Sequence, residues 1–450
     1  MNVLVTGVGG PTPRSFVRAV RNSGRSSLQG FRFIGVDCNQ LSYGLYDRTL
    51  FDAGYLVPRA DHQDYWTQIN HIIEAENISM AVVLPEQEVL VWAENKDKLI
   101  QKVITHLPEP ALASALIDKY RLHVELSHSD LVPAFIQVDP KNYDYKKIVD
   151  KVGENFWIRG TVGSSGFGSL QIGSSTVLDN WIAINSTIEQ FIATEFLPGR
   201  NLACKLLYFD GQMKRSVCAE RVHYIMAKVA PSGITGNTSF GRMLNFPELV
   251  EIAEDTMGSI TAKIGVKPHG IFTLDFKEDQ AGRPKLTEIN VRHVAFNSSL
   301  AAGGANLPAD TLELLQLSDT SSAERIDYTF QQPMIFLRDV DGEPIVMPEA
   351  ALLGAEQDYS LSTRTSTVSD KANGAAPIQM LMGLLNSILE TSCRPALDHL
   401  QPQDRLQEDL GFDSLELAEL TVRLEAETGV DVFRDGVVRT VGEILAKLNP

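Results

Sequence analysis

A short polar run near residue 290 has the residue types of a metal and phosphate site. The sequence LTEINVR (residues 286–292) alternates polar and apolar side chains, so Glu288, Asn290 and Arg292 share one face of a predicted strand. A hairpin turn before this strand would bring Asp275 about opposite Glu288. Two carboxylates and an amide oxygen suit Mg²⁺ that bridges nucleotide phosphates, and Arg292 could hold an anionic substrate. The alternative interpretation is an exposed polar face with ordinary ion pairs.

A glycine-rich stretch offers a second candidate for phosphate binding. Residues 160–168 read GTVGSSGFG, between strand-like segments at 156–158 and 170–172. No G-K-[ST] and no helix follow, which excludes a Walker-type P-loop. We therefore predict a glycine flap between antiparallel strands, whose backbone N–H groups could bind phosphates. A flexible hairpin tip without a ligand would have a similar sequence.

The C-terminal part contains a helix start with a serine in its first turn. Residues 411–420 read GFDSLELAEL, in which Asp413 and Glu416 have the spacing of a capping box. Ser414 would lie at the helix N-terminus, where the positive end of the helix dipole favours a phosphodiester. The plain alternative is an amphipathic helix in which Ser414 has no special role.

The order of apolar segments predicts an α/β protein followed by a helical tail. The first hundred residues alternate strand-like and helix-like segments, which predicts a parallel sheet covered by helices. Longer strand pairs mixed with helices follow, and then a stretch rich in Ser, Thr, Asp and Gly that predicts a linker. The predicted domains are residues 1–115 (leading α/β domain), 116–350 (α+β domain), 351–375 (linker) and 376–450 (four-helix bundle).

Composition excludes several classes of protein. The 450 residues carry a formal net charge of −17, which opposes binding to nucleic acid or to an anionic membrane. No apolar run approaches the roughly 18 residues of a membrane span, and the N-terminus predicts a buried strand rather than a secretion signal. The four cysteines are scattered, which fits the reducing cytoplasm, and no histidine has a partner at catalytic spacing. We expect a cytoplasmic protein.

One feature imitates a dinucleotide site. Gly7, Gly9 and Gly10 follow the first predicted strand, and Asp37 follows the second. The sixth position of the G-x-G-x-x-G pattern is Thr12, however, and a proline lies in the turn. We therefore do not expect NAD binding.

In this order, the motifs of roughly residues 1–320 resemble the ATP-grasp superfamily, in particular its carbamoyl-phosphate-synthase-like branch. The resemblance implies an ADP-forming ligase in which Arg292 and Asn290 act in catalysis. It implies a magnesium site formed by Asp275, Glu288 and Asn290. The ATP contacts that it implies are Lys119, Arg159, Gly163, Ser164, Ser165, Gly166, Glu195, Phe196, Leu197 and Asn201. Arg159 and Asn201 depart from the family pattern, which usually has lysine and glutamate there.

The last 75 residues resemble acyl and peptidyl carrier proteins, which implies that Ser414 carries a 4′-phosphopantetheine arm. The two resemblances together imply that ATP activates a carboxylate, by analogy an amino acid, and that the arm thiol receives it in a biosynthetic pathway. The implied partners are this small substrate, a phosphopantetheinyl transferase and downstream carrier-dependent enzymes. An amide-forming ligase, an inactive docking scaffold and a homodimer are alternatives that the sequence leaves open.

Overall fold

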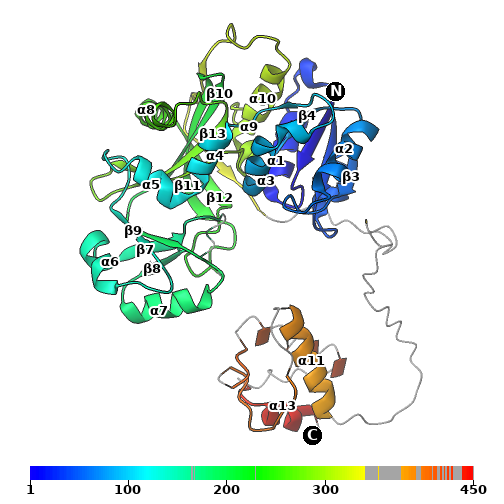
Figure 1. The fold of residues 1–450 in the computed structure, drawn as a ribbon, viewed down its shortest axis with the longest axis vertical. Helices are drawn as coiled ribbons and strands as arrows, with labels where there is room; N and C mark the ends of the chain where they lie inside the picture. The colour runs from blue at the N-terminus through cyan, green and yellow to red at the C-terminus, as the bar shows by residue number, and fades with distance from the viewer. Residues whose placement is uncertain are drawn as a thin grey trace. The chain divides into compact units, whose positions relative to one another are not determined.

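The chain forms two compact units, Met1–Tyr359 and Ser360–Pro450. The computed structural model describes residues 1–163, 166, 168–228, 230–339, 353, 377–391, 397–407, 409–412, 416–417, 420, 423–424, 427–428 and 438–448. Most of the predicted linker therefore lies outside the described residues, and the predicted domain boundaries stay a prediction. Figure 1 shows the first unit as a leading lobe, a central sheet and a smaller lobe.

The leading lobe is a parallel sheet covered by helices, as predicted. Its strands have the order β3-β2-β1-β4-β5, and the order reverses between β1 and β4. Val3, Leu4 and Val5 are fully buried, as expected for a parallel strand that is covered on both faces. The elements are β1 (Asn2–Thr6), α1 (Pro11–Arg21), β2 (Arg32–Asp37), β3 (Ala53–Leu56), α2 (Tyr65–Ala75), β4 (Ile78–Val82), α3 (Glu86–Glu94) and β5 (Ile104–Thr105), with 3₁₀ turns at Ser26–Leu28, Tyr43–Leu45 and Lys96–Lys98.

The smaller lobe is a four-stranded antiparallel sheet with the order β6-β9-β7-β8. Two helices, α6 and α7, pack on this sheet, and Phe156, Ile158 and Phe191 lie in their shared core. The antiparallel pairing of β7 with β8 confirms the predicted strands on both sides of the glycine-rich stretch. The elements are α4 (Pro110–Ile117), α5 (Lys119–Glu125), β6 (Phe135–Val138), α6 (Tyr145–Val152), β7 (Phe156–Gly160), β8 (Leu170–Ile172), α7 (Ser175–Ile184) and β9 (Phe191–Glu195), of which α4 and α5 precede the sheet.

The central sheet joins the two lobes. Its order is β14-β13-β10-β11-β12-β16, and β15 pairs with β11. Helix α8 packs against β10 and β11, while α9 and α10 pack against α1 of the leading lobe (Figure 1). The elements are β10 (Asn201–Phe209), β11 (Gln212–Tyr224), β12 (Thr238–Leu244), α8 (Pro247–Ile264), β13 (Gly270–Glu278), β14 (Pro284–Asn290), α9 (Asn297–Ala302), α10 (Leu307–Leu315), β15 (Ile326–Asp327) and β16 (Met334–Leu337).

The second unit has a helical core, as predicted. Helices α11 (Pro377–Thr391) and α13 (Val441–Leu448) share a cluster of buried side chains with Phe412 and Leu420. Thr440 and Glu443 form a capping box at the start of α13, because each side chain accepts a hydrogen bond from the other residue's N–H, at 3.3 and 3.1 Å. Asp413 and Ser414, the predicted attachment point of the arm, lie outside the described residues.

Among the described residues, no helix combines the length and the apolar content that a membrane crossing needs.

Candidate active site

Two adjoining cavities lie in the first unit, and both reach the hairpin of β13 and β14. The larger one, about 340 Å³, lies between the smaller lobe and the central sheet. The smaller one, about 250 Å³, lies between the central sheet and the leading lobe. We call them the larger and the smaller pocket. Their shared lining residues are Lys119, Gly163, Arg221, Gly236, Asp275 and Glu288.

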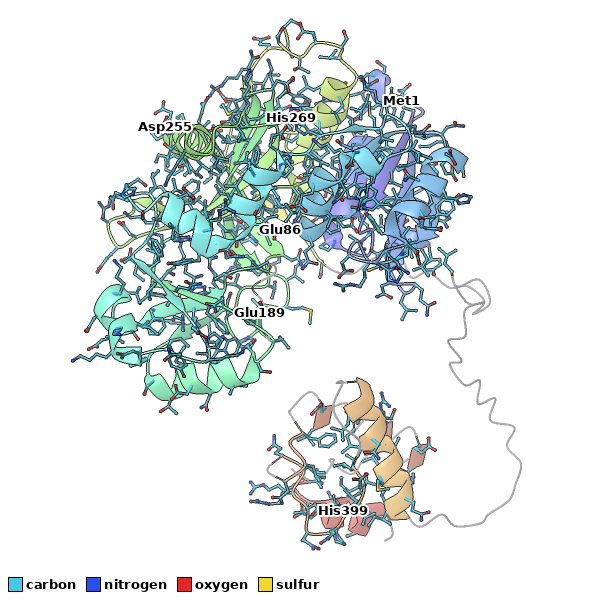
Figure 2. All side chains as sticks on the ribbon, viewed as in Figure 1. Met1, Glu86, Glu189, Asp255, His269 and His399 are labelled. Carbon is cyan, nitrogen blue, oxygen red and sulfur yellow. The ribbon has the colours of Figure 1, made fainter. Side chains whose placement is uncertain are left out.

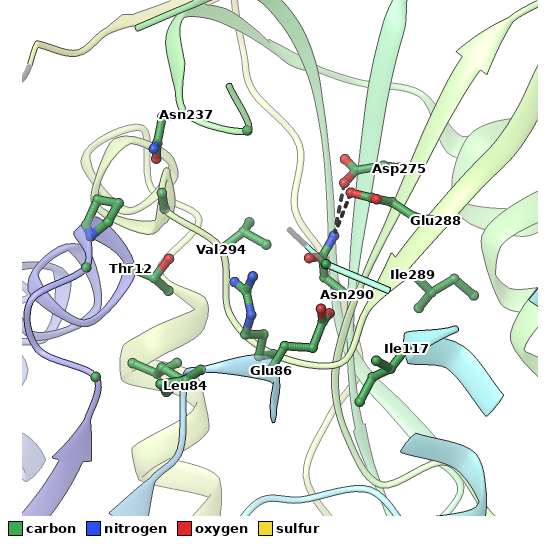
Figure 3. A pocket seen from close by; sticks show the side chains of 18 of the residues that line it. Thr12, Leu84, Glu86, Ile117, Asn237, Asp275, Glu288, Ile289, Asn290 and Val294 are labelled. Atoms are coloured by element: carbon green, nitrogen blue, oxygen red, sulfur yellow. Dashed lines mark hydrogen bonds between the residues drawn. The ribbon is translucent and has the colours of Figure 1, made fainter. Parts of the chain in front are cut away.

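The β13–β14 hairpin brings the predicted oxygen ligands together. Asp275 and Glu288 are direct partners in the strand register, as predicted from the alternation. The side-chain amide of Asn290 donates hydrogen bonds to Asp275 Oδ2 at 3.1 Å and to Glu288 Oε1 at 3.4 Å (Figure 3). Two carboxylates and one amide therefore meet on one face of the hairpin.

The donor set of this hairpin fits a hard divalent cation. Carboxylate and amide oxygens are the ligands that Mg²⁺ prefers, and rotation of the Asn290 amide would present its oxygen in place of its nitrogen. No group of three or more His, Cys, Asp and Glu side chains in the described part of the chain is placed to hold a metal. A metal at this hairpin would therefore depend on the amide as well as on the two carboxylates.

Three cations surround the two carboxylates. Lys119 Nζ lies 3.8 Å and Arg159 Nη1 lies 3.4 Å from Glu288 Oε2. Arg221 Nη1 lies 3.2 Å from Asp275 Oδ1. Arg292, the fourth cation, lines the smaller pocket, and its buried Nε has no hydrogen-bond partner. The site therefore has more positive than negative charge, which favours anionic ligands.

The two carboxylates of the hairpin differ in their tendency to ionise. Burial raises the pKa of Asp275, and the charge of Arg221 only partly opposes this effect. Burial also acts to raise the pKa of Glu288, but the charges of Lys119 and Arg159 outweigh it and lower the pKa below its usual range. Glu288 is thus the ionised member of the pair. An added cation would have its larger effect on Asp275, because it would favour the charged form that burial disfavours.

Lys119 connects the glycine-rich stretch to the hairpin. It is the first residue of α5, and its N–H donates to Thr161 O at 2.8 Å. Its ammonium group donates to Gly163 O at 2.7 Å. Burial lowers the pKa of Lys119, and the charge of Glu288 partly restores it. Lys119 is thus held where a phosphate in either pocket could reach it.

Arg159 reaches the central sheet from the smaller lobe. It lies on β7, and its guanidinium donates to the carbonyl oxygen of Thr287 as well as to Glu288. Burial lowers the pKa of Arg159, and its Nε lacks a partner. A buried guanidinium with an unused donor is well suited to bind an anion.

The predicted hinge lies along the larger pocket. Glu195 is the last residue of β9, and Phe196 and Leu197 follow it in the pocket wall. Asn201, at the start of β10, also lines this pocket and accepts a hydrogen bond from Lys277 Nζ at 3.4 Å. The structure therefore brings the predicted hinge residues together along one pocket.

The glycine-rich stretch contributes Gly163 and Gly166 to the larger pocket, whereas Ser164 and Ser165 lie outside the described residues. Gly166 has a φ of +76° and packs directly against the carbonyl group of Ile234, in the loop between β11 and β12. Two loops thus meet beside this pocket.

The smaller pocket opens at the carboxyl ends of β1 and β4. This is where the strand order of the leading sheet reverses, the usual place for a ligand in an open α/β sheet. Thr12, Leu84 and Ile117 form part of its wall, together with Glu86 at the start of α3 (Figure 3). Glu86 lies where the leading lobe meets the rest of the first unit (Figure 2).

Sequence reasoning missed Arg221 and Glu86. Arg221 lies on β11 within a run that has no motif, and only the fold brings it to Asp275. Glu86 comes directly after the fourth strand, so the rule for carboxyl ends of parallel strands could have identified it.

The glycine turn after β1 and Asp37, which resemble a dinucleotide site in the sequence, contact each other in the structure. Asp37, the residue that would hold a ribose, instead accepts a hydrogen bond from the N–H of Gly9 at 2.8 Å. Its carboxylate therefore stabilises the glycine turn of this chain.

Comparisons with known proteins agree with this architecture. The chain is similar to N5-carboxyaminoimidazole synthetase from Staphylococcus aureus complexed with ADP (TM-score 0.53, 14% identity, 75% of this chain and 81% of that chain). It is similar to L-amino acid ligase from Bacillus licheniformis (TM-score 0.53, 13% identity, 71% and 75%). A third similar structure is the biotin carboxylase domain of 2-oxoglutarate carboxylase from Hydrogenobacter thermophilus (TM-score 0.53, 13% identity, 73% and 71%).

Residues 381–448 match the family model described as a phosphopantetheine attachment site. No curated protein sequence matches the chain. The structural similarity confirms the predicted α/β architecture of the first unit, and the family model confirms the predicted type of the second. The chain therefore joins a first unit with the ATP-grasp fold to a C-terminal segment of the phosphopantetheine-attachment type.

Proposed function

We propose that the protein is an ADP-forming ligase that activates a carboxylate, in particular an amino acid, as an acyl phosphate and transfers it to a phosphopantetheine thiol on Ser414. The observation that carries this proposal is the junction of the two pockets. A carboxylate pair and three cations lie at the point where a nucleotide in the larger pocket would meet a small molecule in the smaller one.

Each residue at the junction has a role in this proposal. Lys119 and Arg159 neutralise the phosphates, while the hinge from Glu195 to Leu197 binds the adenine edge. Asp275, Glu288 and Asn290 would hold magnesium, which supplies charge neutralisation at the phosphates when it is bound. Arg292 orients the acid, and Arg221 stabilises the charge of the transferring phosphoryl group. The glycine flap excludes water from the acyl phosphate.

The proposed reaction balances in two steps. A carboxylate oxygen of the substrate attacks the γ-phosphorus of ATP, and ADP leaves. The sulfur of the arm thiol then attacks the acyl carbon, phosphate leaves, and the thiol proton passes to solvent. The products are ADP, phosphate and a thioester. The phosphopantetheine-attachment segment supports the choice of a thiol as acceptor.

The smaller pocket supports an amino acid as the substrate. Arg292 and Glu86 both line it, and the charge of Arg292 acts on Glu86, whose pKa burial nevertheless raises. A zwitterion offers a carboxylate to the first and an ammonium group to the second. Leu84, Ile117 and Val294 leave an apolar wall in a cavity of about 250 Å³, which suits a small apolar side chain.

The proposal is tested with the full-length protein after a phosphopantetheinyl transferase has installed the arm. The protein is incubated with ATP, Mg²⁺ and a panel of amino acids and other carboxylic acids. The expected result is ADP release with a matching gain in intact protein mass, which a Ser414→Ala variant lacks. Formation of AMP would contradict the acyl phosphate, and a free amide product would support the amide-forming ligase instead. Absence of nucleotide turnover with every acid would favour a docking scaffold.

A further inference from the structure

Lys205 is a buried lysine in the middle of the central sheet. It lies on β10, and only 1% of its surface is exposed. Its register partners are Val217 on β11 and Thr273 on β13, so neighbouring strands cover it on both sides. Burial lowers its pKa to about 7, and in the part of the chain that the structure describes no carboxylate pairs with it. A buried amine without an ionic partner is costly unless other groups accept its hydrogen bonds.

The contacts of Lys205 lead to the connection between β14 and α9 (residues 291–297), which we call the β14–α9 loop. The ammonium group donates a hydrogen bond to Oδ1 of Asn297, a fully buried residue. The same oxygen lies 3.4 Å from Nδ1 of His293. Lys205 Nζ also lies 5.6 Å from the centre of the Phe296 ring, within the range of a cation–π contact. Lys205 therefore ties the end of this loop to the central sheet.

The β14–α9 loop forms one wall of the smaller pocket. Arg292, Val294 and Ala295 line this pocket, and Figure 3 shows Val294 in its wall. Nη1 of Arg292 donates to the carbonyl oxygen of His293 at 3.1 Å, whereas its buried Nε has no partner. The position of the guanidinium thus depends on the backbone of the loop that carries it.

The ring of Phe296 also connects Lys205 to a second cation of the site. The guanidinium of Arg221, which pairs with Asp275, lies 6.0 Å from the centre of this ring. The ring stacks on Phe336 with a distance of 5.8 Å between the ring centres. Lys205 and Arg221 therefore both depend on the position of Phe296.

We propose that Lys205 is a positioning residue for the acid substrate: it holds Asn297 and Phe296, and thereby keeps Arg292 where it binds the carboxylate. Lys205 is not among the described residues that line the two pockets, so it acts through the β14–α9 loop. The inference rests on the proposed function and deepens it, because it names a buried residue on which the affinity for the acid depends.

The test uses two buried lysines of the same sheet. Lys205→Met removes the amine but keeps an unbranched apolar chain in the core. Lys214→Met is the matched control, because Lys214 is only 3% exposed and lies on the neighbouring strand β11. It donates to the carbonyl oxygens of Ser321 and Ala323 at 3.3 and 3.0 Å, beyond α10. Both variants lose a buried amine, but only Lys205→Met releases the β14–α9 loop.

Two variants change the partner of the lysine. Asn297→Ala removes the oxygen that accepts from Lys205 and should reproduce the effect of Lys205→Met. Asn297→Asp keeps an oxygen at this place and should recover most of the affinity that Asn297→Ala loses. The double variant of Lys205→Met and Asn297→Ala should resemble each single variant, because the two residues act through one contact.

The assay is ADP release by the full-length protein, with the acid that gives the fastest release in the panel described above. We expect Lys205→Met to raise the KM for this acid about tenfold, because an arginine binds a carboxylate through bonds of fixed direction. The KM for ATP should stay within about twofold of wild type, and Lys214→Met should leave both values unchanged. Peptides that span residues 291–297 should exchange amide hydrogens faster in Lys205→Met than in Lys214→Met.

Equal KM values for the acid in Lys205→Met and Lys214→Met would overturn the inference. Equal increases in the KM for the acid and for ATP would also overturn it, because the lysine would then support the whole site. If the wild type releases no ADP with any acid, the proposed function itself fails, and the role of Lys205 in acid binding fails with it. Hydrogen exchange distinguishes the two failures, since it reports on the loop without turnover.

Discussion

The contact between the glycine flap and the loop after β11 allows a sharp test of the site. An ideal Cβ on Gly166 would lie 2.2 Å from the carbonyl oxygen of Ile234, which is backbone and cannot rotate away. Gly233 has a similar φ, +68° against +76°, but an added Cβ there would meet nothing within 4 Å. Both Gly166→Ala and Gly233→Ala therefore place an alanine at a positive φ, at a cost of about 1–2 kcal/mol. Only Gly166→Ala adds a collision with the backbone of Ile234.

The collision requires the two loops to separate by about 1 Å, and a misplacement of this size can lower a rate by up to roughly 10²-fold. Gly166 and Ile234 both line the larger pocket, so we expect nucleotide affinity and turnover to fall together. We predict that kcat/KM for ATP falls by about 10- to 100-fold in Gly166→Ala relative to Gly233→Ala.

The assay is steady-state ADP release with varied ATP, together with calorimetric binding of ADP and thermal unfolding of both variants. Unfolding temperatures that agree within a few degrees would show that the loss arises at the flap. Equal kcat/KM values for the two variants would refute the reasoning, because the contact with Ile234 would then have no role in the closed site.

Three further predictions follow from the buried charges. Glu288→Gln removes the anion that Lys119 and Arg159 face, so ADP formation should fall at least about 10²-fold while ADP still binds in calorimetry; turnover above a tenth of wild type would contradict this role. Glu86→Gln should raise the KM for the amino acid about tenfold and leave the KM for ATP unchanged. A change in the KM for ATP alone would contradict the role of Glu86 in binding the ammonium group of the amino acid. Burial lowers the pKa of Lys205 to about 7, whereas the unfolded lysine holds its proton to about pH 10. The free energy of unfolding of the wild type should therefore rise by about 3 kcal/mol from pH 7 to pH 9.5 relative to Lys205→Met, as measured by urea denaturation, and parallel pH profiles would contradict the titration.

The β13–β14 hairpin could be predicted because its pairing depends on residues that are close together in the sequence. Alternation with a period of two places Glu288 and Asn290 on one face, and the spacing to the turn places Asp275 opposite Glu288. The flap strands β7 and β8 were predicted for the same reason. In both cases the paired strands are neighbours in the sequence, so their own residues are enough to predict them.

Arg221 could not be predicted because its role depends on tertiary position. It is the tenth residue of a thirteen-residue strand, and its neighbours in sequence have no motif. Its guanidinium reaches Asp275 only because β11 and β13 lie on either side of β10 in the central sheet.

The ion pairs of Glu288 suggest how binding of the substrates is coupled. Lys119 and Arg159 belong to segments next to the glycine flap, whereas Glu288 belongs to the central sheet. These two ion pairs connect α5 and β7 to the hairpin. Phosphates in the larger pocket would compete for the same two cations and leave the Glu288 carboxylate available for a metal. The nucleotide and the metal are therefore expected to bind together. The phosphates replace Glu288 as the anionic partner of the two cations, and the metal replaces the two cations as the partner of Glu288.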